Sequence, residues 1–329
     1  MSDPIWISEA EVVQLMHLGE AIDALENGLR LEAAGQAQNM NKTALVWHGG
    51  HTLHALGATF EGAGVFGTKT WGHTAGGATP LMILWDMNDG ALKAVIEAFA
   101  MGQMRTGGIS GVATRWMAEK NADDFAIIGT GNQAITQVAA VAAVRPIKRL
   151  RVHSPSPESR RKFVERVRAL FAFEVIDVDT VEKAVAGASI VTTVTRAREP
   201  FLHAAMLRRG AHVNAVGAIS PEREELLQDV FPRSGLVVVD NLPAVQKLAT
   251  EMIKSYGNRG DWSKLKLLSA QVADGRGRPA DCDLTLFKAM GMGISDLSLA
   301  LEIHNRALAT GAGRRFPHPQ RAEPRLNGN

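Results

Sequence analysis

Apolar residues in the first third of the chain follow two different spacings. Near the N-terminus they recur at helical intervals: Ser8 and Glu11 form a capping box, and a second apolar repeat runs on to Gly35. From residue 42 to 70, short apolar runs are broken by glycine, which is typical of antiparallel strands. The chain is therefore expected to open with a mixed α and β unit. Helices are expected from Ser8, over 21–33 and over 100–118, and strands over 44–47, 53–58, 65–66 and 81–85.

After Asn121 the pattern becomes regular. Apolar runs of strand length alternate with segments of helix length, such as Ala134–Val144 and Glu158–Leu170. This alternation, with short connections, predicts an α/β domain with a Rossmann-type, doubly wound parallel sheet, and six strands suit two mononucleotide-binding halves. The six runs are Phe125–Ile128, Leu150–Val152, Val175–Val178, Ile190–Val194, Val213–Val216 and Leu236–Val239.

The C-terminal part contains one more apolar run beyond Leu265 and then a helix expected over Leu297–Ala309, ending at Gly311. This helix is too short to form a core of its own, so it is expected to pack against the N-terminal third. The first domain would then be discontinuous. We expect a mixed α+β domain made of residues 1–117 with 300–329, and a nucleotide-binding Rossmann domain over 118–299.

Length, composition and charge exclude several classes of protein. The chain has 329 residues with 46% hydrophobic and 21% charged residues, which is ordinary for a globular enzyme. The net charge is +2, and the last 19 residues carry four arginines against Glu323, a local +3. With aromatic residues at 5% there is no basic stripe interleaved with aromatics, so no nucleic-acid partner is expected.

The sequence shows no membrane span, no secretion signal and no pair of cysteines, which bears on where the protein is expected to be found. No apolar run reaches the ~18 residues of a membrane span, and the sequence Met1–Pro4 does not begin a secretion signal. The single cysteine, Cys282, excludes an intrachain disulfide framework. We therefore expect a soluble, cytoplasmic protein without a membrane partner.

A glycine loop follows the first strand of the regular region. Phe125–Ile128 leads directly into the pattern G-x-G-x-x-A and then a helix, which is the setting that a dinucleotide fingerprint requires. Gly129 permits the tight turn, Gly131 lets the backbone approach a pyrophosphate, and Ala134 lets helix and strand pack closely. The expected cofactor-binding residues of this loop are Gly129, Thr130, Gly131, Asn132, Gln133 and Ala134.

The end of the second strand bears on the choice between NAD and NADP. An acid there would bind the ribose 2′-hydroxyl and repel a 2′-phosphate, but this position is Ser154. It is followed by Ser156 and Ser159 and then by Arg160 and Arg161, a setting that would accept a phosphate. NADP is therefore favoured over NAD. The alternative, in which the two arginines only face solvent, stays open.

Six short motifs stand in a fixed order along the chain: Phe66–Lys69, Met104–Gly108, Ile127–Ala134, Val191–Thr195, Gly210–Gly217 and Leu286–Gly291. Taken together, they resemble the ornithine cyclodeaminase/mu-crystallin family over nearly the whole chain, to about residue 311. The resemblance implies a homodimer whose smaller domain, formed by N- and C-terminal segments, binds substrate and makes the dimer contact. It also implies hydride transfer between nicotinamide C4 and the α-carbon of a small amino or imino acid.

The resemblance also implies particular site residues. Lys69 matches a lysine of the substrate pocket, and Arg105 matches an arginine that reaches the substrate carboxylate near the cofactor, so both are expected to bind substrate and to act in catalysis. Lys42 stands where the family has a first substrate arginine and keeps only its charge. Further cofactor contacts are expected from Arg105, Thr106, Thr193, Thr195, Val216 and Gly217.

One departure from the family pattern decides between reactions. Ornithine cyclodeaminases have an aspartate that accepts a proton from the substrate amine, and the matching residue here is Ile219. We therefore favour an NAD(P)H-dependent imino-acid (ketimine) reductase or amino-acid dehydrogenase. The alternatives are a deaminating lyase with bound NAD, against which Ile219 argues, and a non-catalytic crystallin-like NADPH-binding protein, against which Lys69 and Arg105 argue.

Other candidate groups carry less weight. His48, His51 and His54 lie in strand-like sequence without an acid or cysteine at ligand spacing, so no metal site is expected. Cys282 stands between two aspartates that would raise the pKa of its thiol, which argues against a nucleophile. Asp296 is expected to open the last helix, in a region that approaches the cofactor in the family, and is a weak site candidate.

Overall fold

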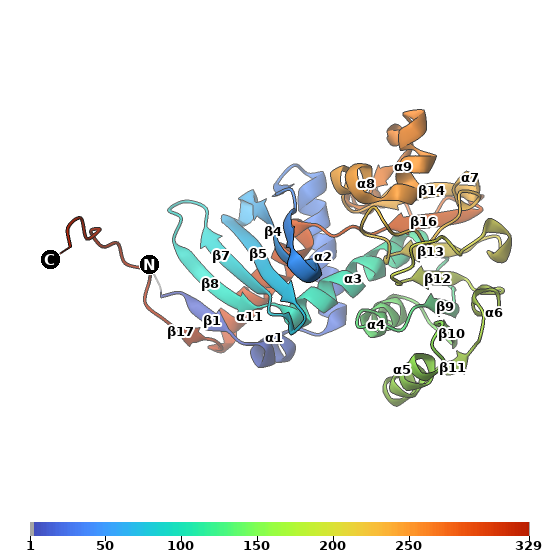
Figure 1. Cartoon of the computed structure of the whole chain (residues 1–329), viewed down its shortest axis with the longest axis horizontal. Helices are drawn as coiled ribbons and strands as arrows, with labels where there is room; N and C mark the ends of the chain where they lie inside the picture. Colours follow the sequence, from blue (N-terminus) through green and yellow to red (C-terminus); the bar gives the residue numbers. More distant parts are fainter. Residues whose placement is uncertain (1–2, 329) are drawn as a thin grey trace.

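The computed structural model describes residues 3–328 and contains two sheets joined by a long helix (Figure 1). The first sheet has nine strands in the order β17-β1-β8-β7-β5-β4-β2, with β3 paired to β4 and β6 to β5. All its pairings are antiparallel except β1 with β8. Its strands are β1 Ile5–Ile7, β2 Ala37–Asn39, β3 Thr43–Trp47, β4 His51–Phe60, β5 Val65–Thr74, β6 Gly77–Ala78, β7 Leu81–Asp86, β8 Leu92–Glu97 and β17 Arg314–Arg315.

The second sheet is entirely parallel and has eight strands in the order β11-β10-β9-β12-β13-β16-β14-β15. This arrangement confirms the expected doubly wound α/β domain, but the sheet has eight strands where six were expected. The six expected runs are β9 to β14; β15 and β16 are added to them, and β16 lies between β13 and β14. The strands are β9 Asp124–Ile128, β10 Arg149–His153, β11 Glu174–Asp177, β12 Ile190–Thr193, β13 His212–Ala215, β14 Ser234–Val239, β15 Lys266–Leu267 and β16 Leu284–Lys288.

The helices include those expected from the apolar repeats. The Ser8 capping box is present at the start of α1, and the glycine after α2, Gly35, has a φ of 71°. The α-helices are α1 Glu9–Leu15, α2 Leu18–Ala33, α3 Phe99–Met117, α4 Ala134–Val144, α5 Pro157–Leu170, α6 Val181–Val185, α7 Val230–Arg233, α8 Leu242–Leu248, α9 Thr250–Ser255, α10 Leu268–Ala273 and α11 Gly293–Thr310.

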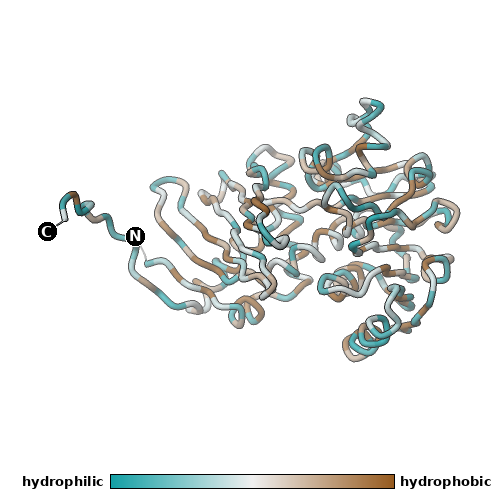
Figure 2. Tube along the Cα trace, viewed as in Figure 1, coloured by the Kyte–Doolittle hydropathy of each residue, from teal (hydrophilic) through white to brown (hydrophobic). Residues whose placement is uncertain are grey.

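The continuous apolar runs of the parallel strands arise because successive side chains point to opposite faces of the sheet and both faces are covered. On β9, Phe125 and Ile127 pack with α4 and α5, while Ala126 and Ile128 pack on the opposite face of the sheet. Both faces of a doubly wound sheet are covered, so every position of a central strand is buried. Hydrophobic segments accordingly concentrate in the strands of both sheets, and the stretch after β17 is mostly hydrophilic (Figure 2).

Helix α3 connects the two sheets and contains several glycines. A Cβ at Gly107 would lie 2.6 Å from the carbonyl oxygen of Thr136 on α4, and one at Gly108 would lie 2.6 Å from Leu25 on α2. The glycines therefore let α3 pack closely against helices on both sides. This close packing offsets their low helix propensity.

Helix α11 returns from the parallel sheet to the first sheet, as expected for a C-terminal helix without a core of its own. It begins at Gly293, earlier than expected, and packs against α2, β4 and β5. Its buried face includes Leu297, Ala300 and Ile303. In the described part of the chain, no helix is both long enough and apolar enough to cross a membrane.

Candidate active site

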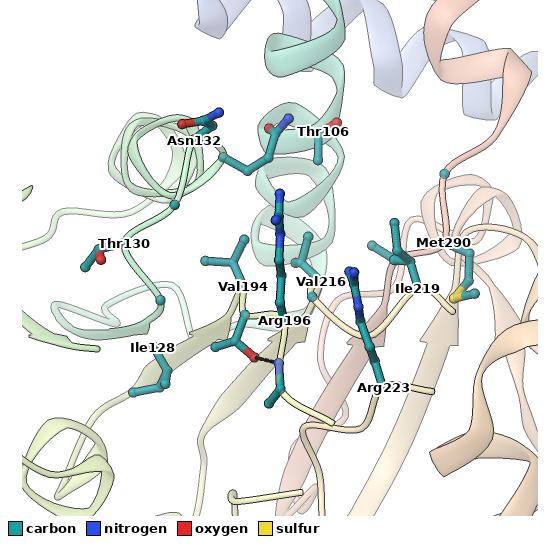
Figure 3. Close-up of a pocket in the computed structure, with 18 of the residues that line it drawn as sticks. Thr106, Ile128, Thr130, Asn132, Val194, Arg196, Val216, Ile219, Arg223 and Met290 are labelled. Atoms are coloured by element: carbon teal, nitrogen blue, oxygen red, sulfur yellow. Dashed lines mark hydrogen bonds between the residues drawn. The ribbon is translucent and has the colours of Figure 1, made fainter. Parts of the chain in front are cut away.

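A cavity of about 900 Å³ lies at the carboxyl ends of the parallel strands. Ligands of open α/β sheets bind at this edge, outside the ends of the strands. Strands of the first sheet and helix α3 close the opposite side. Figure 3 shows Thr106 of α3 on that side, with Arg196 and Arg223 directed into the space from the parallel-sheet side. The lining includes Lys42, Leu56, Trp71, Arg105, Thr106, the loop 128–133, His153, Ser154, Ser159, Thr195, Arg196, Val216, Gly217, Ile219, Arg223, Asp240, Met290 and Gly291.

The glycine loop has the geometry that a dinucleotide requires. Gly129 has a φ of 110°, and a Cβ there would lie 2.5 Å from the carbonyl oxygen of Val194, so no other residue fits without strain. Gly131 has open space where its Cβ would be, which lets a ligand approach the backbone. Ala134 is buried at the start of α4, and the Oε1 of Gln133 is buried without a protein partner. The loop therefore fits a pyrophosphate at a helix N-terminus.

The two arginines after β10 differ in their surroundings, because Arg161 is exposed and Arg160 is buried. Arg160 does not face solvent; it is 9% exposed and donates to Asp177 at 2.6 Å and to the carbonyl of Ser154 at 2.8 Å. Ser154 and Ser159 line the cavity, while Ser156 caps α5 by accepting from the amide of Ser159. The cavity therefore presents hydroxyl groups at this end, and Arg160 is neutralised by Asp177 behind them.

A buried ion cluster lies at the other end of the cavity. Lys69 on β5 donates to a carboxylate oxygen of Asp296 on α11, and the Arg105 guanidinium on α3 lies 3.4 Å from the same oxygen. Lys69 is only 4% exposed and lies behind the cavity wall formed by Arg105 and Trp71. The second oxygen of Asp296 has no hydrogen-bond partner. Asp296 is thus the third member of this cluster, within the last helix rather than at its cap.

Charges and burial shift the ionisation of this cluster. Burial lowers the pKa of Lys69 to about 8, and the neighbouring Asp296 limits the fall. The pKa of Lys42 is also lowered, mainly because surrounding protein atoms exclude water from its ammonium group and secondly because the Arg105 charge repels it. Both ammonium groups lie over the Trp71 ring, Lys69 at 5.2 Å and Lys42 at 5.9 Å from its centroid. Lys69 can therefore gain and lose a proton near neutral pH.

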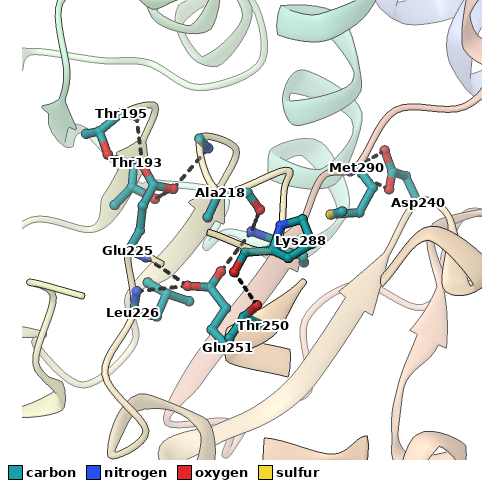
Figure 4. Close-up of polar contacts among 12 residues, drawn as sticks. Thr193, Thr195, Ala218, Glu225, Leu226, Asp240, Thr250, Glu251, Lys288 and Met290 are labelled. Atoms are coloured by element: carbon teal, nitrogen blue, oxygen red, sulfur yellow. Dashed lines mark hydrogen bonds and ion pairs between the residues drawn. The ribbon is translucent and has the colours of Figure 1, made fainter. Parts of the chain in front are cut away.

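Glu225 holds two loops of the cavity wall together (Figure 4). Its carboxylate accepts from the Thr193 hydroxyl at 2.8 Å, from the amide and the hydroxyl of Thr195 at 2.7 Å each, and from the Gly217 amide at 2.9 Å. Burial raises the pKa of Glu225, and the Lys288 charge opposes that rise. Four donors favour the ionised form, so we assign Glu225 as a carboxylate.

The buried pair of Lys288 and Glu251 stabilises the same segment of the cavity wall. The Lys288 ammonium donates to Glu251 at 2.7 Å and to the carbonyl of Ala218 at 2.6 Å, and both side chains are completely buried. The other oxygen of Glu251 accepts from the amides of Glu225 and Leu226. The segment 217–226, which contains Ile219, is thereby fixed relative to the sheet.

Asp240 organises the loop after β16. It accepts from the amides of Met290 and Gly291 at 2.8 Å each, and its own pKa is raised by burial. A Cβ at Gly291 would lie 2.9 Å from Arg105, so the arginine packs directly on this backbone. Asp240 therefore positions the loop on which the Arg105 guanidinium rests.

The structure brings most of the expected site residues to one cavity, but not all of them. Gly129, Thr130, Gly131, Asn132, Gln133, Ser154, Ser159, Thr195, Val216, Gly217, Lys42, Arg105 and Thr106 line it. Four expected residues lie elsewhere: Ala134 is packed inside α4, Ser156 caps α5, Thr193 faces Glu225, and Lys69 lies behind the wall. Sequence reasoning missed Glu225, Asp240, Arg196 and Arg223, whose surroundings carry no local motif signal.

The histidines have surroundings of a different kind. His54 stacks on Trp71 with ring centroids 4.7 Å apart, and burial lowers its pKa. His212 is completely buried between Thr285 and Asn214, and burial lowers its pKa to about 3. Within residues 3–328 no group of three or more His, Cys, Asp or Glu side chains is arranged to hold a metal ion.

Comparisons with known proteins agree with this geometry. An alanine dehydrogenase from Archaeoglobus fulgidus is 29% identical over 315 residues, which cover 93% of this chain and 96% of that protein. The structure of Thermococcus litoralis Delta(1)-pyrroline-2-carboxylate reductase with NADH and L-proline has a TM-score of 0.88 at 27% identity and covers 95% of this chain and 100% of its own. An archaeal alanine dehydrogenase dimer with bound NAD has a TM-score of 0.86 at 26% identity, with 95% and 99% covered.

These relatives are oxidoreductases whose names or complexes refer to a nicotinamide cofactor or a small amino or imino acid. A sequence model described as the ornithine cyclodeaminase/mu-crystallin family matches residues 3–311, which confirms the resemblance seen in the motifs. With a match over nearly its whole length and the same fold as these enzymes, the chain belongs to the ornithine cyclodeaminase/mu-crystallin family.

Proposed function

We propose that the protein is an NAD(P)H-dependent imino-acid reductase, or an amino-acid dehydrogenase in the reverse direction. The observation that carries this proposal is the buried Lys69–Asp296–Arg105 cluster at one end of a cavity whose other end is a dinucleotide loop. A non-catalytic binding protein would not need a buried lysine whose pKa is near 8. The relatives that reduce imino acids or oxidise alanine support the same reaction class.

Each residue of the cluster has a distinct task in this reaction. Arg105 presents a planar guanidinium for the substrate carboxylate, and Lys42 adds a second positive charge. The bound cofactor supplies a hydride to the α-carbon. Lys69, in its protonated form, passes a proton through water to the imine nitrogen, so the C=N bond becomes CH–NH with one hydride and one proton. Asp296 keeps the Lys69 ammonium protonated and oriented between turnovers.

Ile219 favours reduction over cyclodeamination. It lines the cavity and is 39% exposed, so an apolar side chain stands where a cyclodeaminase needs a proton acceptor. Among the described residues that line the cavity, Asp240 is the single acid, and two backbone amides already occupy its carboxylate. The described part of the wall therefore offers no free carboxylate for a substrate side-chain amine.

For the cofactor we propose a preference for NADP over NAD. Ser154 and Ser159 line the adenosine end of the cavity, and no carboxylate among the described lining residues is available there to repel a 2′-phosphate. Arg161 follows the buried Arg160 on α5 and is exposed, but it is not among the residues that line the cavity. The neutralisation of Arg160 by Asp177 predicts a modest preference, about tenfold or less.

We further propose a homodimer in which residues 1–117 with 300–329 form the substrate and dimerisation domain and 118–299 the cofactor domain. The hairpin of β3 and β4 leaves four large apolar side chains uncovered. Large apolar side chains left exposed together on one hairpin suit an interaction site. Leu45, Val46, Trp47 and Leu53 are between 43% and 66% exposed.

The test is an assay of reduced-cofactor oxidation with purified protein. NADPH and NADH are each combined with cyclic imino acids, and with pyruvate or glyoxylate plus ammonia or methylamine. Oxidation that depends on the imino acid is expected, and it should be abolished in Lys69→Met with cofactor binding retained. Absence of turnover with every substrate while NADPH still binds, or release of ammonia and proline from ornithine, would refute the proposal.

A further inference from the structure

The cavity contains more positive charge than one substrate carboxylate needs. Among the described residues that line it, four side chains are cationic, namely Lys42, Arg105, Arg196 and Arg223, and one is acidic, Asp240. Arg105 and Lys42 already serve the α-carboxylate in the proposed reaction. Two arginines are therefore left for other anionic groups.

These two arginines point into the cavity from different loops. Arg196 follows β12 and extends between Val194 and Val216 toward Thr106, whereas Arg223 lies on the side of Ile219 (Figure 3). Thr106 and the glycine loop belong to the cofactor end, so Arg196 faces the region of the pyrophosphate. Arg223 lines the cavity beside Ile219 (Figure 3), and Arg105 belongs to the same wall.

Arg223 is not neutralised by a neighbouring acid. Its closest carboxylate, Glu222, is 4.0 Å away and more than half exposed, and that side chain instead accepts from the Ser220 hydroxyl at 2.7 Å. An exposed pair at that distance contributes little. The Arg223 charge is therefore available to a ligand.

The backbone that carries Arg223 is held firmly on its C-terminal side. Glu224 pairs with Lys254 at 2.6 Å, and the carboxylate of Glu225 has the four donors described above. On the other side, the amide of Arg223 donates to the carbonyl of Ser220 at 3.1 Å. A side chain that starts from a fixed backbone loses less entropy when it binds a carboxylate.

We propose that the substrate carries a second acid group, as the imine of a short 2-oxo dicarboxylic acid does, and that Arg223 binds its distal carboxylate. The inference rests on the proposed function. Arg105 and Lys42 hold the α-carboxylate, Ile219 contacts the intervening methylene, and the planar guanidinium of Arg223 donates two hydrogen bonds to the distal carboxylate. The reaction is unchanged: one hydride reaches the α-carbon, one proton reaches nitrogen, and the product is an amino dicarboxylate. A cationic side chain such as that of ornithine would meet Arg223 and be repelled.

The experiment compares oxaloacetate and 2-oxoglutarate with pyruvate, each with ammonia and with NADPH or NADH. The kcat/KM for a diacid is expected to exceed that for pyruvate by about tenfold to a hundredfold, the range for one hydrogen-bonded charge pair. In Arg223→Met the ratio of diacid to pyruvate should fall by a similar factor, and Arg223→Lys should retain part of it. Arg198→Met removes an exposed charge outside the cavity lining and should leave the ratio as it is.

Three results separate the possible failures. A preference for pyruvate, or a ratio that does not change in Arg223→Met, overturns the dicarboxylate inference but leaves the reductase intact. An increase in the cofactor KM that is equal for both substrate classes in Arg223→Met assigns this arginine to the cofactor and overturns it too. If no imino acid is reduced, the proposed function fails. In that case calorimetry measures the affinities of aspartate and of alanine for the NADP-loaded protein, and equal affinities overturn the dicarboxylate inference.

Discussion

The buried pair of Lys288 and Glu251 allows a sharp test of how the cavity wall is stabilised. Both side chains are 0% exposed and their charged atoms are 2.7 Å apart. Lys288→Met would leave the Glu251 carboxylate buried with only two backbone amides as partners. Removing one member of a buried pair strands the other charge, which costs about 3–5 kcal/mol of unfolding free energy.

The chain contains a matched control. Lys162 and Glu158 are 2.6 Å apart, nearly the same separation, but their side chains are 75% and 69% exposed. Lys162→Met should therefore cost at most about 1 kcal/mol, because water screens the pair and solvates the remaining carboxylate. The two variants remove the same charge and differ mainly in burial.

Urea unfolding followed by far-UV circular dichroism measures both costs. The double variant Lys288→Met/Glu251→Gln removes the stranded charge, so it should recover part of the stability lost in Lys288→Met. Equal losses of unfolding free energy for Lys288→Met and Lys162→Met would refute the reasoning, since burial would then have no effect on the cost of breaking an ion pair.

Three further predictions concern catalysis, cofactor binding and assembly. The rate of imine reduction should fall as pH rises through about 8, because burial lowers the pKa of Lys69 to that value and its protonated form supplies the proton. The rate of amino-acid oxidation should rise over the same pH range. Rates that do not change with pH in either direction would contradict this role of Lys69. Gly129→Ala should weaken NADPH binding at least about tenfold in a fluorescence titration, with the circular dichroism spectrum retained. The φ of Gly129 is 110°, and the added Cβ would lie 2.5 Å from the carbonyl oxygen of Val194, so the loop would have to change shape. Val46→Lys should shift the mass measured by light scattering from dimer to monomer, and an unchanged mass would remove the β3–β4 hairpin from the interface.

Much of the fold could be predicted because the relevant signals are local. The capping box at Ser8, the apolar runs of the parallel strands and the helix ending at Gly311 all depend on neighbours within a few residues. The strand order was less accessible. The place of β16 between β13 and β14 depends on a crossover that no local pattern encodes. The short strands β1, β2, β6 and β17 pair with distant partners and carry too few residues for a periodic signal.

The site divides in the same way. The glycine loop was readable because strand, turn and helix follow one another in sequence, and Lys69 and Arg105 were found through motif resemblance. Only the tertiary structure placed Asp296 against Lys69, 227 residues away, and set Glu225 and Lys288 under the cavity wall. The reason is physical: the spacing of residues along the chain determines which local elements can form. The energy of a charge depends instead on the burial and the partners it acquires through space.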